Sequence, residues 1–179
     1  SANVGSFASL LHETIKIAQE TFGPSHRPIN ILQLTHSGRY SRPEGKAAPL
    51  VPQHDPILDP PLDISADSPI ISDAYLDDLI GAYVKSALLA QEAGYDGVDI
   101  KSCHRYLISE LLACYTRPGK YGGSFENRTR FPLTIIKEIR NAVGSDFIIA
   151  SRLNVFDAHP YPYGWGVDEK DFLKPNLNE

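Results

Sequence analysis

The sequence predicts an α/β fold with parallel strands. Along its 179 residues, three helical stretches alternate with three short apolar runs of strand length, starting with a helix. Strands that are joined through helices pair in parallel by right-handed crossovers. Because nothing repeats at a fixed period and no internal boundary divides the chain, we expect residues 1–179 to form a single unit.

The first helix and the first strand are predicted at residues 3–22 and 29–34. Apolar side chains recur in the first range at steps of three and four residues, which indicates an amphipathic helix, and Gly23 ends it. This apolar stripe consists of Phe7, Leu10, Leu11, Ile15, Ala18 and Phe22. The apolar run 29–34 has the length of a strand and ends at the polar segment 35–39.

The second helix is predicted between Ser72, a residue type that caps helix N-termini, and Gly94, a residue type that follows their C-termini. Its inward positions are expected to be Leu76, Leu79, Ile80, Tyr83, Ala87 and Ala90. A second strand is predicted at 95–100, with Val98 and Ile100 as its apolar positions.

The third helix is predicted from about Phe125 to the stop at Gly144, and the third strand at 146–150. Its expected inward positions are Phe131, Ile135, Ile136, Ile139 and Val143. The preceding segment 121–124 (YGGS) lacks the spacing of known phosphate-binding loops, so we interpret it as a tight turn with Ser124 as the helix cap.

Residues 43–71 are predicted to be an irregular, proline-rich excursion. Seven of the 14 prolines of the chain fall in this segment, and proline lacks the amide donor that regular structure needs. Long irregular connections of this kind usually cover a site or lack order. The sequence leaves open whether the segment is a lid or an interface arm.

Composition excludes several classes of function. With 17 basic and 22 acidic side chains the net charge is −5, which argues against a nucleic-acid-binding surface. No apolar stretch is long enough to cross a membrane. Cys103 and Cys114 form neither a disulfide framework nor a CxxC pair, so we expect no metal site and a cytoplasmic location. The chain starts at Ser1 and has no methionine, so we expect it to be processed, tagged or excised.

Reactive groups are expected where the strands end, because parallel α/β folds gather them at the carboxyl edge of the sheet. Gln33 offers donors and acceptors that suit a heteroaromatic ring edge, although in isolation a satisfied interior glutamine is the somewhat simpler interpretation. Arg152 follows an apolar strand, where its charge needs an anion. Either an electron-rich cofactor oxygen or a neighbouring carboxylate would supply that anion.

The segment after the second strand, residues 101–106 (KSCHRY), contains a histidine and a tyrosine two positions apart. His104 can donate a hydrogen bond to an oxygen where negative charge develops, and Tyr106 can deliver a proton. On spacing alone, a capped strand end with a buried tyrosine and an exposed histidine is the more economical interpretation. Cys103 is interpreted as a small core residue.

Four longer segments carry a characteristic combination of motifs. They are residues 31–39 (ILQLTHSGR), 94–100 (GYDGVDI) with the following HRYL at 104–107, 121–131 (YGGSFENRTRF), and 146–153 (DFIIASRL). Together they resemble the old yellow enzyme family of NADH:flavin oxidoreductases and NADH oxidases. The third segment is long enough to be highly specific.

The resemblance implies a (β/α)8 barrel that holds FMN at its carboxyl rim. Only about three strands are present here, so the chain is expected to be an incomplete central segment, equivalent to the third to fifth barrel strands. The expected activity is reduction of an activated C=C bond by an FMN-dependent oxidoreductase, with NAD(P)H as the electron donor. The groups that grip the FMN phosphate are not in this chain, so we expect the fragment to be inactive alone.

The resemblance also implies a role for each site residue. Gln33 would bond the pyrimidine edge of the flavin, and Arg152 would lie near its N1 and O2 atoms. His104 would hold the carbonyl oxygen of the substrate, and Tyr106 would protonate the α carbon while hydride reaches the β carbon. Lys101 stands where the family usually has a histidine; it either shifts substrate choice towards anionic acceptors or points away.

Two interpretations of the whole chain remain. The first is the flavin-dependent enzyme segment, with an unsaturated carbonyl compound or enoate as substrate and no nucleic-acid or membrane partner. The second is a non-catalytic, truncated or degenerate barrel segment that serves as a structural or assembly module. In either case the partner that closes the barrel is expected to be the missing remainder of the barrel or another copy of the chain, because an isolated part-barrel leaves unpaired edges.

Overall fold

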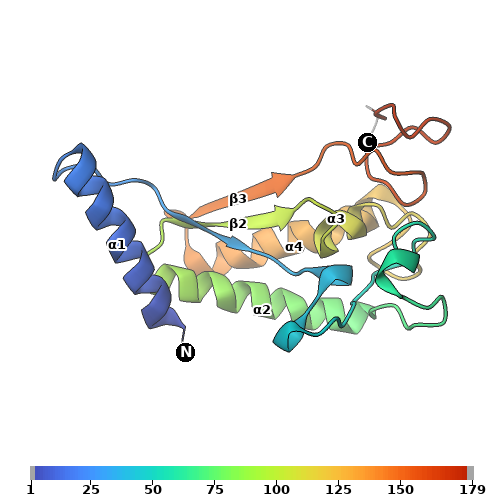
Figure 1. Cartoon of the computed structure of the whole chain (residues 1–179), viewed down its shortest axis with the longest axis horizontal. Coiled ribbons are helices and arrows are strands. Elements are labelled where there is room, and N and C mark those ends of the chain that lie inside the picture. The colour runs from blue at the N-terminus through green and yellow to red at the C-terminus, as the bar shows by residue number, and fades with distance from the viewer. Residues whose placement is uncertain (1–2, 177–179) are drawn as a thin grey trace.

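The computed structural model describes residues 3–176 and contains a parallel three-stranded sheet with two long helices packed beside it (Figure 1). The strands β1 (Ile31–Leu34), β2 (Gly97–Ser102) and β3 (Ile148–Leu153) lie in the order β1-β2-β3. Both pairings are parallel, in the order in which the strands occur along the chain. The predicted α/β fold with parallel strands is therefore confirmed.

The two long helices, α2 (Asp73–Glu92) and α4 (Phe125–Val143), begin at the predicted caps. The hydroxyl of Ser72 accepts a hydrogen bond from the backbone amide three residues later, at 3.1 Å. Ser124 makes the equivalent bond at the start of α4, at 3.3 Å. Each bond satisfies one of the amides that a helix N-terminus leaves without an intrahelical partner.

The core lies between these helices and one face of the sheet. Val98 and Ile100 of β2 are fully buried, as predicted. The helices contribute the remaining large side chains of the core, chiefly Leu76, Tyr83, Phe131, Ile135 and Ile139. Burying each such side chain contributes roughly 1.5–3 kcal/mol to folding, so this layer is what holds the sheet to the helices.

Helix α1 (Val4–Phe22) forms where its apolar stripe predicts, but it leaves half of that stripe exposed. Leu11 is buried, whereas Leu10 is 60% and Phe22 is 72% exposed. The helix lies across one end of the molecule and contacts α2 (Figure 1). An amphipathic stripe normally faces a core, and here the described residues cover only part of it.

A short helix, α3 (Leu107–Leu112), is the element that the sequence pattern did not predict. All six of its residues are buried, so the sequence LISELL has no polar face and no amphipathic period. It packs against the end of β1, where the Leu107 amide donates to the His36 carbonyl at 3.2 Å. Gly38 has a φ of +59° there, and a Cβ at this position would lie 3.0 Å from the Leu107 nitrogen.

The carboxyl ends of the three strands point to the same end of the molecule, where the irregular segments gather (Figure 1). Segment 43–71 contains two single 3-10 turns, Pro43–Gly45 and Pro60–Leu62, and is otherwise irregular, as its prolines predict. It is nevertheless packed, because Val51 is 2% exposed and its carbonyl accepts a hydrogen bond from the Ile71 amide at 2.9 Å.

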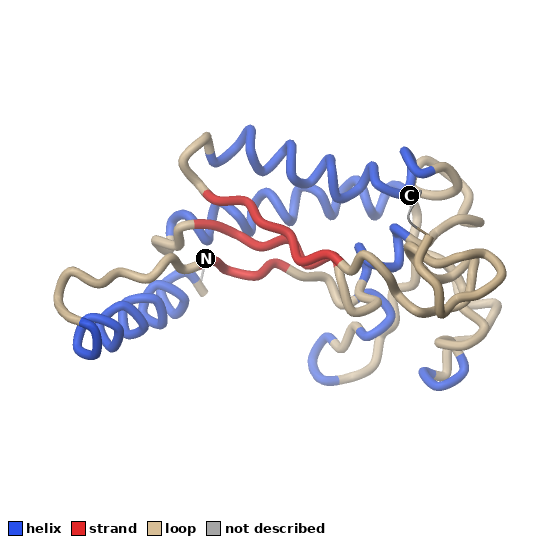
Figure 2. Tube along the Cα trace, turned by 90° about the horizontal axis from the view of Figure 1, so that it is seen from above, coloured by secondary structure: helices blue, strands red, loops and turns tan. Residues whose placement is uncertain are grey.

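The second face of the sheet is open, since both long helices lie on the same side of the strands (Figure 2). Ile31 and Ile148 on the open face are 41% and 37% exposed. β1 and β3 each keep one unpaired edge within residues 3–176, so the sheet is not closed into a barrel. In the same range, no helix combines the length and the apolar character needed to cross a lipid bilayer.

Candidate active site

Polar side chains from all three strands lie on the open face of the sheet. Side chains alternate between the two faces of a strand, and the register places Gln33 beside Asp99 and Lys101 beside Arg152. The buried positions of β2, such as Ile100, face the helices instead. Three separate strands therefore deliver an amide, a carboxylate and two cations to one surface near their carboxyl ends.

Gln33 and Asp99 are joined directly by a hydrogen bond. The Gln33 Nε2 atom donates to Asp99 Oδ2 at 2.6 Å, while Asp99 Oδ1 is buried without a hydrogen-bond partner among the described residues. Arg152 lies beside them and makes no hydrogen bond or ion pair within residues 3–176. A hollow of about 490 Å³ is lined by Ile31, Gln33, Asp99, Ala150, Ser151 and Arg152.

Lys101 and Tyr106 are also brought together. The Lys101 Nζ atom lies over the Tyr106 ring, 3.5 Å from its centroid, which is a cation–π contact. The Tyr40 ring also packs against it, at 5.8 Å between centroids. The ammonium group is thus held against the predicted proton donor.

His104 lies on a strained turn between β2 and α3. His104 and Arg105 have φ values of +62° and +56°, in a region that residues with a side chain rarely adopt. The His104 side chain is exposed and makes no hydrogen bond within the described residues. Arg105, in contrast, is anchored by ion pairs to Asp157 at 3.0 Å and Asp55 at 3.4 Å, which hold the turn in place.

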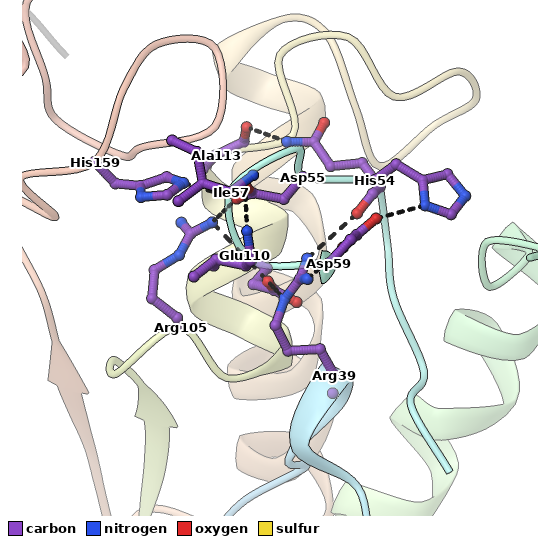
Figure 3. A network of polar contacts seen from close by, with 12 residues as sticks. Arg39, His54, Asp55, Ile57, Asp59, Arg105, Glu110, Ala113 and His159 are labelled. Carbon is purple, nitrogen blue, oxygen red and sulfur yellow. Dashed lines mark hydrogen bonds and ion pairs between the residues drawn. The ribbon is translucent and has the colours of Figure 1, made fainter. Parts of the chain in front are cut away.

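Next to this turn lies a buried network of charged side chains (Figure 3). Arg39, which follows β1, is 2% exposed and donates through Nε to Glu110 of α3. Its Nη1 atom donates to Asp59 of the excursion at 2.6 Å, and Asp59 in turn bonds the His54 ring at 2.7 Å. The network therefore fixes segment 43–71 to both the end of β1 and α3.

The carboxylates of this network have shifted pKa values. Burial raises the pKa of Glu110 to about 7, although Arg39 and Arg105 favour its ionised form. Burial also opposes ionisation of Asp55, but the hydrogen bonds from His159 and from two backbone amides outweigh it and lower the pKa to about 2. Asp55 is thus held as an anion between His159 and Arg105, which joins the C-terminal segment to the excursion.

The donor set on the open face fits the polar edge of a planar heteroaromatic ring. Gln33 presents both an acceptor and a donor, and Arg152 presents a fixed fork of donors. One oxygen of Asp99 is buried without a hydrogen-bond partner, so a donor that would satisfy it is missing among the described residues. The pyrimidine edge of FMN, with alternating carbonyl oxygens and an N–H group, matches this combination of groups.

Two features of this region were not predicted from the sequence. They are the place of Asp99 on the open face and the burial of Arg39 in ion pairs. Asp99 carries a usable signal, because a carboxylate between the buried Val98 and Ile100 must face the other side of its strand. Arg39 belongs to the polar segment 35–39 that was expected at the reactive edge, but it is buried in ion pairs and holds the structure together. Its partners come from distant segments, so the sequence carries no local signal for them.

Comparison with known proteins identifies the relatives of this chain. Residues 27–164 match the NADH:flavin oxidoreductase / NADH oxidase family. An NADH oxidase from Thermoanaerobacter brockii is 42% identical over 81 residues, which is 44% of this chain and 12% of that protein. An NADPH dehydrogenase from a Geobacillus species is 32% identical over 146 residues, which is 79% of this chain and 39% of that protein.

The fold has the same relatives. The old yellow enzyme from a Pichia species superposes with a TM-score of 0.66 and 26% identity, over 87% of this chain and 41% of that one. Structural neighbours of this kind are (β/α)8 barrels, of which the present chain matches a part. The chain thus spans well under half of the length of each of these relatives.

Proposed function

Because this chain belongs to the NADH:flavin oxidoreductase / NADH oxidase family, the family of the old yellow enzymes, we propose that it supplies part of the active site of an FMN-dependent oxidoreductase. The complete protein would reduce activated C=C bonds with NAD(P)H. The observation that carries the proposal is the convergence of Gln33, Lys101 and Arg152 on one open sheet face, with Tyr106 against Lys101. The activity is proposed for the complete protein, since the chain spans only part of its relatives.

Gln33 and Arg152 would hold the cofactor. The Gln33 amide would bond the polar pyrimidine edge, and the Arg152 guanidinium would stabilise the negative charge that reduction places on that edge. When bound, FMN supplies the hydride transfer between the nicotinamide and the electron-poor carbon. Both side chains line the same hollow, which lets them act on one ring.

Lys101, His104 and Tyr106 would act on the substrate. An activated alkene carries a carbonyl or carboxylate oxygen, which Lys101 and His104 can bind through N–H donors. This binding withdraws electron density and makes the far alkene carbon a better hydride acceptor. Tyr106 would then donate its phenolic proton to the α carbon. The contact between the Lys101 ammonium and the Tyr106 ring supports a shared role for these two residues.

The proposal is tested on the complete protein by flavin spectroscopy and by the Tyr106→Phe variant. The purified protein is expected to show the absorption bands of bound flavin. In the variant, the half-reaction with an unsaturated acceptor should slow by about 10²-fold, because phenylalanine fills the same space without a proton to donate. The half-reaction with NAD(P)H should keep its rate, as measured by stopped-flow absorbance.

The exposed Tyr161→Phe change, on the C-terminal segment, is the matched control and should leave both half-reactions unchanged. Equal losses in the two half-reactions of Tyr106→Phe would contradict the proton-donor role. A complete protein that purifies without flavin and cannot be reconstituted with FMN would contradict the proposed function. That outcome would favour the second candidate, an assembly module, which the unpaired edges of β1 and β3 also support.

A further inference from the structure

Asp99 is a half-buried carboxylate for which the proposed reaction has no use. It lies in the middle of β2, directly across from Gln33 in the register, and lines the same hollow as Arg152. One of its oxygens accepts the 2.6 Å hydrogen bond from Gln33 Nε2, and the other is buried without a hydrogen-bond partner in the described chain. That second oxygen requires an explanation, because burying a carboxylate oxygen without a hydrogen bond is costly.

We propose that Asp99 is a positioning residue, which fixes the orientation of the Gln33 amide and tunes the charge of the ring-binding hollow. This inference rests on the proposed function, since it concerns how the chain presents Gln33 to FMN. A free glutamine amide can rotate by half a turn and exchange its oxygen and nitrogen. Next to Asp99, the reversed orientation would place the amide oxygen against a carboxylate oxygen, so only one orientation remains favourable.

The fixed orientation has a consequence for recognition. Because one N–H of Gln33 is held by Asp99, the amide keeps its oxygen as an acceptor and its second N–H as a donor. An adjacent acceptor and donor match an N–H group beside a carbonyl oxygen, which is the pattern of a pyrimidine-dione edge. The bond to the carboxylate is charge-assisted, so it also polarises the amide and holds it in place before the ligand arrives.

The charge of Asp99 has a second, separable effect. The carboxylate lines the same hollow as the guanidinium of Arg152, so it partly offsets that positive charge. Reduction of a flavin adds negative charge to the pyrimidine edge, and a nearby carboxylate opposes this addition. Replacement of Asp99 by asparagine keeps an acceptor for Gln33 but removes the charge. The variant should therefore bind FMN almost normally, with a higher reduction potential.

The test uses the complete protein and four variants: Asp99→Ala, Asp99→Asn, Gln33→Ala, and the double variant of Asp99→Ala with Gln33→Ala. The dissociation constant of FMN is measured from quenching of flavin fluorescence, and the reduction potential of the bound flavin from a redox titration. We expect Asp99→Ala to weaken FMN binding by about tenfold. In the Gln33→Ala background, the same change should have little further effect, because Asp99 acts through Gln33.

A matched control is Asp96→Asn, at the residue that precedes β2. Asp96 is likewise a hydrogen-bonded aspartate, paired with Arg27 at 2.7 Å, but it lies outside the hollow. This variant should keep both the dissociation constant and the potential of the wild type. If Asp99→Ala does not fold, as judged by circular dichroism, the Asp99→Asn potential still decides the charge effect.

The outcomes separate this inference from the proposed function. Wild-type affinity in Asp99→Ala or additive losses in the double variant would overturn the positioning role, and an unchanged potential in Asp99→Asn would overturn the charge effect, while FMN binding stands in each case. A wild-type protein that binds no FMN would overturn the proposed function, and this inference with it.

Discussion

Lys101 stands at a position where the resemblance to the family leads us to expect a histidine. Its ammonium group is held over the Tyr106 ring, and we therefore propose that it forms part of the site. A cation at this position favours acceptors that carry a carboxylate, because an ammonium pairs with a full negative charge more strongly than with a neutral carbonyl. We therefore expect Lys101 to set substrate choice.

The Lys101→His variant of the complete protein tests this role. Rates with a panel of enoates should fall by about tenfold relative to rates with the matching enones, because the variant loses a charge-assisted hydrogen bond. The exposed Lys137→His on α4 serves as the control and should keep the wild-type ratio. An unchanged ratio in Lys101→His would show that the lysine does not select the substrate.

At the scale of single residues, hydrogen bonds between residues close in sequence could be predicted, whereas hydrogen bonds between side chains of different strands could not. The caps at Ser72 and Ser124 were predictable, because a cap involves residues only three positions apart. The Gln33–Asp99 bond joins residues 66 positions apart and depends on the register of two strands. A shift of one residue in that register would place one of the two side chains on the opposite face.

At the scale of elements, the buried charge network explains why a proline-rich segment is well packed. Asp55 and Asp59 of the excursion meet Arg105 and Arg39, which flank the ends of β2 and β1. Removing one partner from such a buried pair leaves an uncompensated charge and typically costs 3–5 kcal/mol. The excursion is therefore fixed by specific ion pairs where regular hydrogen-bonded structure is absent.

Asp55 predicts a pH dependence of stability. Its pKa is lowered from 3.8 to about 2 in the folded chain, so the unfolded chain binds more protons between these values. The resulting stabilisation is complete above about pH 5 and is lost as the pH falls through 2. From the pKa difference, it amounts to about 2 kcal/mol between pH 5 and pH 2.

Urea unfolding of the complete protein at several pH values measures this effect. The free energy of unfolding of Asp55→Asn should fall less steeply with acid than that of the wild type, by the same ~2 kcal/mol over this range. The exposed Asp78→Asn on α2 should follow the wild-type curve. Parallel curves for Asp55→Asn and the wild type would contradict a depressed pKa at Asp55.

Element boundaries show where hydrophobic patterns stop being informative. The third strand was predicted at 146–150, but β3 runs from Ile148 to Leu153. Its second half contains Ser151 and Arg152, and polar residues after an apolar run normally indicate that a strand has ended. Such residues continue a strand when they line a polar hollow on an open face. The polar residues of the candidate site therefore made the C-terminal end of β3 difficult to predict from the sequence.

At the scale of the whole molecule, the open sheet unites the fold and the proposed chemistry. In the (β/α)8 relatives further strands continue the sheet, so the face that is open here corresponds to a barrel interior. This arrangement accounts for exposed aliphatic side chains such as Ile31 on the open face. The order of helices and strands in the sequence predicted the layers correctly. Within residues 3–176, however, no further strand closes the sheet into a barrel.

The central claim is that Gln33 and Arg152 on this face bind the pyrimidine edge of a flavin. A crystal structure of the complete protein grown with FMN tests it most directly. The account predicts that the Gln33 amide and the Arg152 guanidinium lie within hydrogen-bonding distance, about 3 Å, of the oxygen and nitrogen atoms of that edge. FMN bound elsewhere, or bound here with both side chains turned away from the ring, would contradict the account.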